Sequence, residues 1–157
     1  FIAMINYFLF DIIGYYSGLN EVIAEATMYD GLSLQTILGY IFAPLAWVIG
    51  IEVQDMLLSG QLLGEKTVIN EFIAYLSMKE ILAGSSGQIL QERSVIILTY
   101  ALCGFSNFSS IGIQIGGISS IAPNQRGTLA KLGLRALVGG TLACLMTATI
   151  AGMLFSL

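Results

Sequence analysis

GFSNFSSIG, residues 104–112, lies in the middle of an uncharged run that extends from residue 94 to residue 125. That run is longer than the ~20 apolar residues that a helix needs to cross a bilayer. Glycine, serine and asparagine at its centre disfavour a continuous helix. The stretch therefore predicts one of two structures. Either a helix breaks near residues 105–110, or an unbroken helix uses small residues such as Gly112 and Gly116 to pack closely against neighbours.

The composition around this stretch is that of an integral membrane protein. The 157 residues are 56% hydrophobic and only 10% charged, and the mean hydropathy is +0.84. Soluble domains carry about 25% charged residues. Residues 136–157 form a second uncharged run of spanning length, residues 31–51 form a third candidate, and the chain begins with what resembles the end of another apolar helix.

The residue types exclude several classes of function. The net charge of −4 and the lack of a basic cluster argue against nucleic-acid binding. The sequence has no histidine, no P-loop and no Gly-x-Ser-x-Gly motif, so we expect no enzyme active site, no metal site and no cofactor. Cys103 and Cys144 lie in apolar segments without metal-ligand spacing, so we expect buried free thiols. The first residues lack the features of a signal peptide, and we interpret the sequence as part of a longer one.

The order of apolar runs predicts an all-α integral membrane fold. Residues 53–69 and 71–82 are apolar at helical spacing, but neither clearly reaches the spanning length, which indicates a re-entrant helical hairpin. Pro44 leaves open whether its helix is straight or bent. The expected segments are a transmembrane helix end at 1–13, a connector at 14–33 with a short helix at 19–28, an interfacial helix at 34–50, the re-entrant hairpin at 53–82, a polar turn at 84–91, a broken transmembrane helix at 94–123 and a C-terminal transmembrane helix at 128–157.

Charged and aromatic residues indicate how these segments sit in the membrane. Basic residues favour cytoplasmic loops. Arg126, Lys131 and Arg135 therefore place the loop before the last helix in the cytoplasm. Arg93, at the other end of the uncharged run, is the single charge that argues for the opposite orientation. Aromatic interface anchors are expected at Tyr15, Tyr16, Tyr29, Tyr40 and Trp47. Solvated charges near segment ends are expected at Glu52, Asp55, Lys79, Glu80 and Glu92.

The predicted hairpin and the predicted break each offer polar groups for binding. Glu71 stands next to Asn70 inside an apolar run, and a carboxylate at membrane depth is a functional hypothesis by default. A carboxylate can accept two hydroxyl hydrogen bonds, which suits a polyol such as a ribose. The alternative is a solvated interfacial loop, or an ion pair between Glu71 and Lys66. A helix break would add free carbonyl and N–H groups, from which many transporters build their substrate sites.

These two stretches also carry a family resemblance. GEKTVINEFIAY, residues 64–75, matches the pattern G-x-K-x-x-x-N-E-F-x-A-Y of concentrative nucleoside transporters. CGFSNFSSIG, residues 103–112, resembles the broken seventh helix of the same family. The likeness extends through residues 38–50 and on to the C-terminus, and the sequence is similar to the C-terminal half of the bacterial members.

The resemblance implies a transporter in the bacterial inner membrane that imports nucleosides such as uridine by alternating access. It implies symport with sodium or protons, a homotrimer, and a coupling-ion site mainly in an N-terminal half that this sequence does not contain. Ribose contacts are implied for Glu71, Asn107 and Ser110, and a packing contact with the nucleoside for Phe105. Asn70 and Lys66 would support them. The same features fit a second hypothesis, a non-transporting structural or gating membrane module whose glycine and serine residues only pack helices.

Overall fold

The computed structural model describes residues 2–27, 29–84 and 89–155, and every regular element in these ranges is helical. The N-terminal segment forms a continuous helical stretch, with the α-helix α1 (Ile2–Tyr7), the π-helix η1 (Phe8–Gly14) and α2 (Tyr15–Ser17). Gly18, at a φ of 71°, then turns the chain into α3 (Leu19–Ala26), because glycine enters the left-handed region without strain. The first helical stretch thus runs past the expected end at residue 13.

Helix α4 (Leu34–Val48) begins where the Ser33 hydroxyl accepts a hydrogen bond from Thr36 N at 3.1 Å, and it continues through Pro44. It packs tightly against α5 (Met56–Val68). A Cβ atom on Gly60 of α5 would lie 2.7 Å from the backbone N of Ala43, so only glycine permits this approach of the two backbones. Close packing against α4 therefore holds α5, the first helix of the predicted hairpin, in place.

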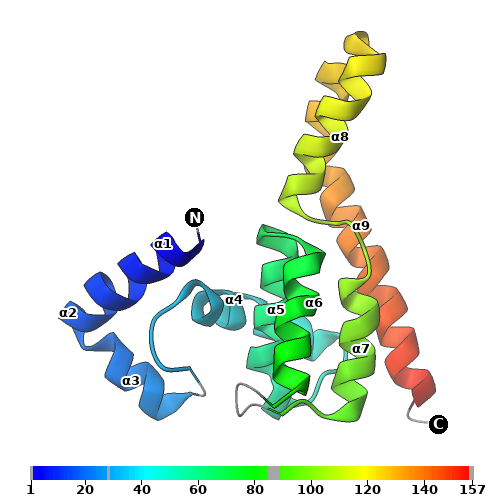
Figure 1. Ribbon diagram of the computed structural model, residues 1–157. Helices are drawn as coiled ribbons and strands as arrows, with labels where there is room; N and C mark the ends of the chain where they lie inside the picture. Colours follow the sequence, from blue (N-terminus) through cyan, green and yellow to red (C-terminus); the bar gives the residue numbers. More distant parts are fainter. Residues whose placement is uncertain (1, 28, 85–88, 156–157) are drawn as a thin grey trace.

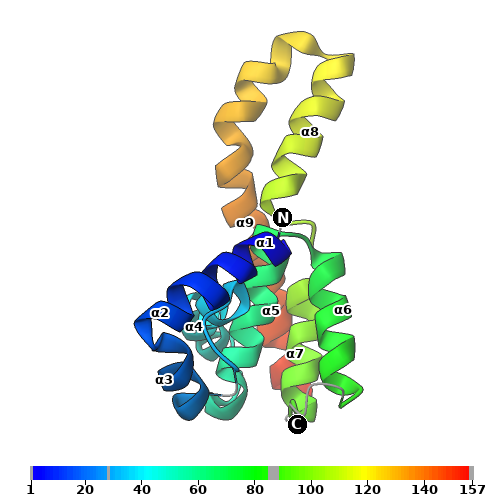
Figure 2. The same ribbon diagram turned by 60° about the vertical axis from the view of Figure 1, so that its left-hand side comes forward.

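The predicted hairpin is an antiparallel pair of helices (Figures 1 and 2). After the 3₁₀ turn η2 (Val53–Asp55), α5 leads to a tight connection at residues 69–70, and α6 (Glu71–Leu82) returns beside it. Asn70 caps α6, because its Oδ1 accepts a hydrogen bond from Ile73 N at 2.9 Å. The predicted polar turn at 84–91 falls partly on residues 85–88, which lie outside the described residues.

The uncharged run is broken, as one of the two alternatives predicts. Helix α7 (Glu92–Leu102) ends before residues 103–107, and α8 (Phe108–Ile121) starts afterwards. The break therefore lies slightly earlier than the expected 105–110. After the 3₁₀ turn η3 (Pro123–Gln125), helix α9 (Arg126–Phe155) runs back past both half-helices, and α8 with the first part of α9 forms an arm that projects from the bundle (Figure 1).

One helical stretch in the described ranges, Pro123–Phe155, is long and apolar enough to cross a membrane. Below the arm, five helices form a bundle with one shared apolar core, to which α4, α5, α6, α7 and α9 all contribute. Its most buried side chains include Leu58, Leu62, Ile97, Leu98, Leu102 and Ala148. The helix break and the hairpin tip lie at the upper end of this core, where the arm begins (Figure 2).

Several expectations about single residues were wrong. Asp55 is buried rather than solvated, because its carboxylate accepts a hydrogen bond from Gln91 N at 3.0 Å. Tyr29 is buried rather than interfacial, and its hydroxyl donates to the carbonyl of Leu57 at 3.1 Å. Burial raises the pKa of the Tyr29 hydroxyl, which keeps it a donor. The exposed fractions of Tyr15, Tyr16, Tyr40 and Trp47 are 51% or more.

The expected burial of the two cysteines was also wrong. Both are free thiols, but Cys103 is exposed and Cys144 is partly exposed. Cys103 lies directly after the last turn of α7, inside the break, where the described residues do not cover it. The close packing suggested for Gly112 and Gly116 is not seen either, because no described atom outside the adjoining residues and backbone of α8 lies within 4 Å of a Cβ placed on either residue.

Candidate functional site

The hairpin tip and the helix break are joined directly by hydrogen bonds. Asn107 Nδ2, in the break, donates to Glu71 Oε2, on the first residue of α6, at 2.7 Å. Ser109 Oγ, in the first turn of α8, donates to the carbonyl of Ile69 in the hairpin tip at 3.2 Å. Two non-helical segments that lie far apart in sequence therefore form one polar junction, and most of the predicted site residues belong to it.

Asn107 is the centre of this junction. It is 2% exposed, and its Oδ1 accepts hydrogen bonds from both Ser110 N, at 2.7 Å, and Ser110 Oγ, at 2.8 Å. The first of these bonds makes Asn107 the N-cap of α8. Since Oδ1 faces two donors, Nδ2 must face the carboxylate, and the bonding pattern fixes the orientation of the amide. Asn107 thus holds Glu71 and Ser110 in a set arrangement.

Glu71 occupies an electrostatically favourable position for an anion. It is the first residue of α6, and through Asn107 it also lies beside the start of α8, so the positive ends of two helix dipoles meet near its carboxylate. The side chain is only partly buried. Its Oε2 is engaged by Asn107, whereas its Oε1 receives no hydrogen bond from the described residues. Glu71 can therefore accept a donor from a bound molecule.

Lys66 contacts the other end of the break, where α7 ends. The residue is 2% exposed, and its Nζ donates to the carbonyl of Ala101, in the last turn of α7, at 2.8 Å. The carbonyl groups of a last helical turn lack intrahelical partners and carry the negative end of the dipole, which suits an ammonium group. The ion pair between Lys66 and Glu71 that the sequence left open is not found among the described residues, where Glu71 is bonded to Asn107. Instead, Lys66 fastens the hairpin to α7, while Glu71 fastens it to α8.

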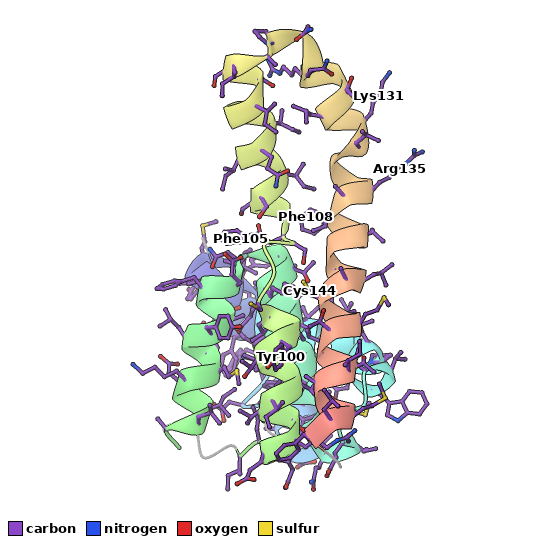
Figure 3. The ribbon with its side chains drawn as sticks, turned by 90° about the vertical axis from the view of Figure 1, so that its right-hand side faces the viewer. Tyr100, Phe105, Phe108, Lys131, Arg135 and Cys144 are labelled. Carbon is purple, nitrogen blue, oxygen red and sulfur yellow. The ribbon has the colours of Figure 1, made fainter. Side chains whose placement is uncertain are left out.

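A cavity of about 380 Å³ opens beside the break, between α8 and α9. That volume lies in the range of small-molecule pockets. Phe105, Asn107 and Ser110 line it, so three of the four predicted binding residues share this wall, while Glu71 approaches them from the hairpin. Phe105 is 76% exposed and lies at the level of the hairpin tip (Figure 3), where its ring is available for stacking.

The structure adds residues that the sequence did not single out. Ser109 bonds to the hairpin tip, and Cys144 on α9 lines the cavity (Figure 3). Ser106 is buried in the break, and its Oγ has no hydrogen-bond partner among the described residues. Gly104 leaves room for Cys144, since a Cβ there would collide with the Cys144 sulfur. The polar composition of residues 104–112 could have indicated the two serines. No local pattern distinguishes Cys144 from the other apolar positions of α9.

Comparison with known proteins assigns this arrangement to a family. A family model described as the C-terminus of Na⁺-dependent nucleoside transporters matches residues 1–152. The chain belongs to this family. The resemblance of the hairpin and break motifs to concentrative nucleoside transporters is thereby confirmed, and the members of this family are transporters rather than enzymes.

Individual concentrative nucleoside transporters agree with this assignment. Human solute carrier family 28 member 3 is 46% identical over 138 residues, which is 82% of this chain and 20% of the relative. Nucleoside permease NupC of Helicobacter pylori is 39% identical over 128 residues, 82% of this chain and 31% of the relative. The chain thus spans about a third or less of the length of these relatives.

Solved structures of another transporter, CNTnw, match nearly the whole chain. An inward-facing, substrate-bound structure covers 96% of this chain and 34% of CNTnw, with 41% identity and a TM-score of 0.84. An outward-facing structure covers 99% of this chain and 34% of CNTnw, with 40% identity and a TM-score of 0.87. The all-helical arrangement of α1 to α9 is therefore that of concentrative nucleoside transporters.

The contact of Lys66 with α7 leads to a first prediction. Lys66→Met keeps the apolar stem but leaves the Ala101 carbonyl without its partner. An unsatisfied buried polar group costs about 1–3 kcal/mol, so we expect a melting temperature several degrees lower. Thermal unfolding in detergent measures this. Lys79→Met, at an exposed position of α6, is the matched control; equal melting temperatures for both variants would contradict the anchoring role.

Proposed function

We propose that the chain is the C-terminal half of a nucleoside importer driven by cation symport, with sodium or protons as the coupling ion. The observation that carries the proposal is the hydrogen bond of Asn107 to Glu71 beside an open cavity, in a member of this transporter family. It supports a polar pocket at the point where a helix break meets a hairpin tip, the arrangement that transporters use for substrate.

The unused bonding capacity of the junction matches a ribose. Glu71 Oε1 is free to accept a hydroxyl hydrogen, Asn107 Nδ2 has a second hydrogen besides the one given to Glu71, and the Ser110 hydroxyl oxygen can still accept. We assign these groups to the ribose hydroxyls and the exposed ring of Phe105 to the face of the nucleoside. Asn70 and Lys66 act indirectly, by capping α6 and by anchoring the hairpin.

The solved structures of CNTnw offer support for two of these assignments. Its outward-facing structures include one variant in which a glutamate is replaced by alanine and another in which a phenylalanine is replaced by alanine. Along that protein the two positions are separated by the same number of residues as Glu71 and Phe105 are here. This spacing is the basis for relating Glu71 and Phe105 to positions that were chosen for substitution in a relative.

For the membrane arrangement, we propose that α5 and α6 form a re-entrant hairpin in the inner membrane of a bacterium and that the complete protein is a homotrimer. Exposed Arg126, Lys131 and Arg135 in the first part of α9 favour a cytoplasmic position for the tip of the arm. Figure 3 shows Lys131 and Arg135 on this arm. The coupling ion is proposed to bind mainly in the N-terminal half, and lipid surrounds the exposed apolar faces.

The mechanism that follows is alternating access by a hairpin and a helix break that move together. Three contacts support their common movement: Lys66 with the Ala101 carbonyl, Glu71 with Asn107, and Ser109 with the Ile69 carbonyl. Because these contacts hold both ends of the break, a displacement of the hairpin would carry the ends of α7 and α8 with it. The nucleoside would then remain on the same residues while access changes sides.

Transport in liposomes tests the proposed function. The full-length protein containing this sequence should accumulate labelled uridine when an inward sodium or proton gradient is applied, and uridine should raise its melting temperature. Liposomes that contain only this chain should show no uptake, since the chain holds one wall of the pocket. A structural or gating module predicts neither accumulation nor thermal protection by the full-length protein, and that pair of results would overturn the proposal.

A further inference from the structure

The core of the hairpin contains a carboxyl group that the proposed substrate site does not use. Glu65, on α5, is 2% exposed. Its Oε1 accepts a hydrogen bond from Gln61 Nε2, one turn earlier in the same helix, at 3.0 Å. Its Oε2 is buried and has no hydrogen-bond partner among the described residues. Buried carboxylate oxygens are normally satisfied, so the bare Oε2 requires a chemical explanation.

The groups that act on Glu65 supply no positive charge. Lys66 is next to it in sequence, but its ammonium group is bonded to the Ala101 carbonyl on α7. Glu80 on α6 is a second negative charge that acts on Glu65. Tyr29, in the connector, is close enough to feel the negative charge of Glu65, but the Tyr29 hydroxyl donates its hydrogen bond to the carbonyl of Leu57. The nearby Ser77 hydroxyl, on α6, is neutral; it and Gln61 favour the charged form of Glu65, but by less than burial disfavours it.

The other titratable groups on elements packed against α5 have contacts of their own. The Arg93 guanidinium on α7 donates to the Gly50 carbonyl, the Asp55 carboxylate accepts from Gln91 N, and the Tyr75 hydroxyl donates to the Thr99 carbonyl. The remaining titratable side chains on these elements are exposed, namely those of Tyr40, Lys79, Glu92 and Tyr100. Glu71 is bonded to Asn107, and α8 carries no titratable group.

An ionised carboxylate in this position would be a buried charge without a counter-charge, which is strongly unfavourable. Protonation removes the charge and turns Oε2 into a donor, for which the Ser77 hydroxyl oxygen can serve as acceptor. The burial of Glu65 is produced by this chain itself. Residues from the rest of a transporter can therefore reach Glu65 only if the contacts of α5 open.

We propose that Glu65 is a proton-binding site, occupied at neutral pH while the hairpin core is closed. When the contacts of α5 open and water enters, the Oε2–H bond breaks, the proton passes to water and the carboxylate remains. Because Glu65 on α5 and Glu71 on α6 belong to the same hairpin, loading and release of the proton accompany movement of the hairpin. This link to uptake rests on the proposed function, whereas the proton site itself does not.

Infrared spectroscopy of the full-length protein in lipid tests the site without any transport. The wild type should show the carbonyl stretch of a protonated carboxyl group at about pH 7, since buried glutamates can remain neutral to about pH 8. The band should be lost in Glu65→Gln and kept, at a shifted position, in Glu65→Asp. Glu80→Gln, at the exposed neighbour, should leave it unchanged. A wild-type spectrum without this band, or one that Glu65→Gln leaves intact, would overturn the proposal.

Thermal unfolding between about pH 5 and about pH 9 gives a second readout. The unfolded chain ionises Glu65 above about pH 4.3, whereas the folded chain keeps the proton. Stability of the wild type relative to Glu65→Gln should therefore fall as pH rises, by up to about tenfold in the unfolding constant per pH unit. A difference between the two proteins that does not change with pH would contradict the site.

Uptake measurements then separate the site from its role in transport. Wild-type uridine uptake should depend on pH in this range, and the dependence should become flatter in Glu65→Gln. An unchanged pH profile in Glu65→Gln would overturn the link to transport while the infrared result stands. Absence of uridine uptake by the wild type would overturn the proposed function and leave the proton site to be decided by the infrared band.

Discussion

Glu71→Gln in the full-length transporter should lower uridine uptake about 10- to 100-fold. The substitution removes the negative charge from the one carboxylate at the junction, and a hydrogen bond to a charged group contributes about 1.5–3 kcal/mol, which corresponds to such a factor in affinity. The glutamine carbonyl can still accept from Asn107 Nδ2, so the contact between hairpin and break should persist. Initial uptake rates and the melting temperature of the purified protein measure the two effects separately.

Glu92→Gln is the matched control for this prediction. Glu92 is the first residue of α7, as Glu71 is the first residue of α6, and it is exposed. Glu92→Gln changes the charge at a helix start by the same amount as Glu71→Gln. However, Glu92 lies at the end of α7 that is away from the break. We expect normal uptake from Glu92→Gln. Equal uptake by the two variants would remove Glu71 from the binding site.

Asn107→Ala should reduce both uptake and stability. The change removes the N-cap of α8, which costs about 0.5–2 kcal/mol, and leaves Glu71 Oε2 and the Ser110 hydroxyl without their partner. We expect a melting temperature lower by several degrees and uridine uptake reduced by at least about tenfold. Uptake by liposomes containing the full-length variant, normalised to folded protein, gives the second value.

Asn107→Ser separates the two roles of this residue. Serine is also a good N-cap, so most of the stability should return. Its hydroxyl cannot cap α8 and also reproduce the amide's reach to Glu71 and to the substrate, so uptake should stay low. Recovery of wild-type uptake in Asn107→Ser would mean that capping α8 is the only function of Asn107.

Local sequence physics predicted much of the fold but only part of the site. The hairpin helices and the start of α4 fall close to their expected positions, because the apolar spacing in residues 53–82 and the apolar run that starts at residue 34 are local features of the sequence. The physics of residues 104–112 alone left both a broken and a continuous helix open. The hydrogen bond between Glu71 and Asn107 joins segments far apart in sequence, and no periodicity predicts such a contact; only the family motifs placed the two residues in one site.

The errors have a common physical cause. Asp55 and Tyr29 were assigned by residue type and position along the chain, yet both are buried by packing between distant elements. Asp55 is satisfied by Gln91 N, and Tyr29 by the Leu57 carbonyl. The exposure of Cys103 follows in the same way from the position of the helix break, which sequence alone located only approximately.

The central claim is that Glu71 and the helix break bind the ribose of a nucleoside. Competition of uridine and 3′-deoxyuridine for uptake, measured in the full-length wild type and in Glu71→Gln, tests it directly. The wild type should prefer uridine by about tenfold or more, since losing a hydroxyl bonded to a charged group costs about 1.5–3 kcal/mol. Glu71→Gln should lose most of that preference. An equal preference for uridine in both proteins would contradict the claim.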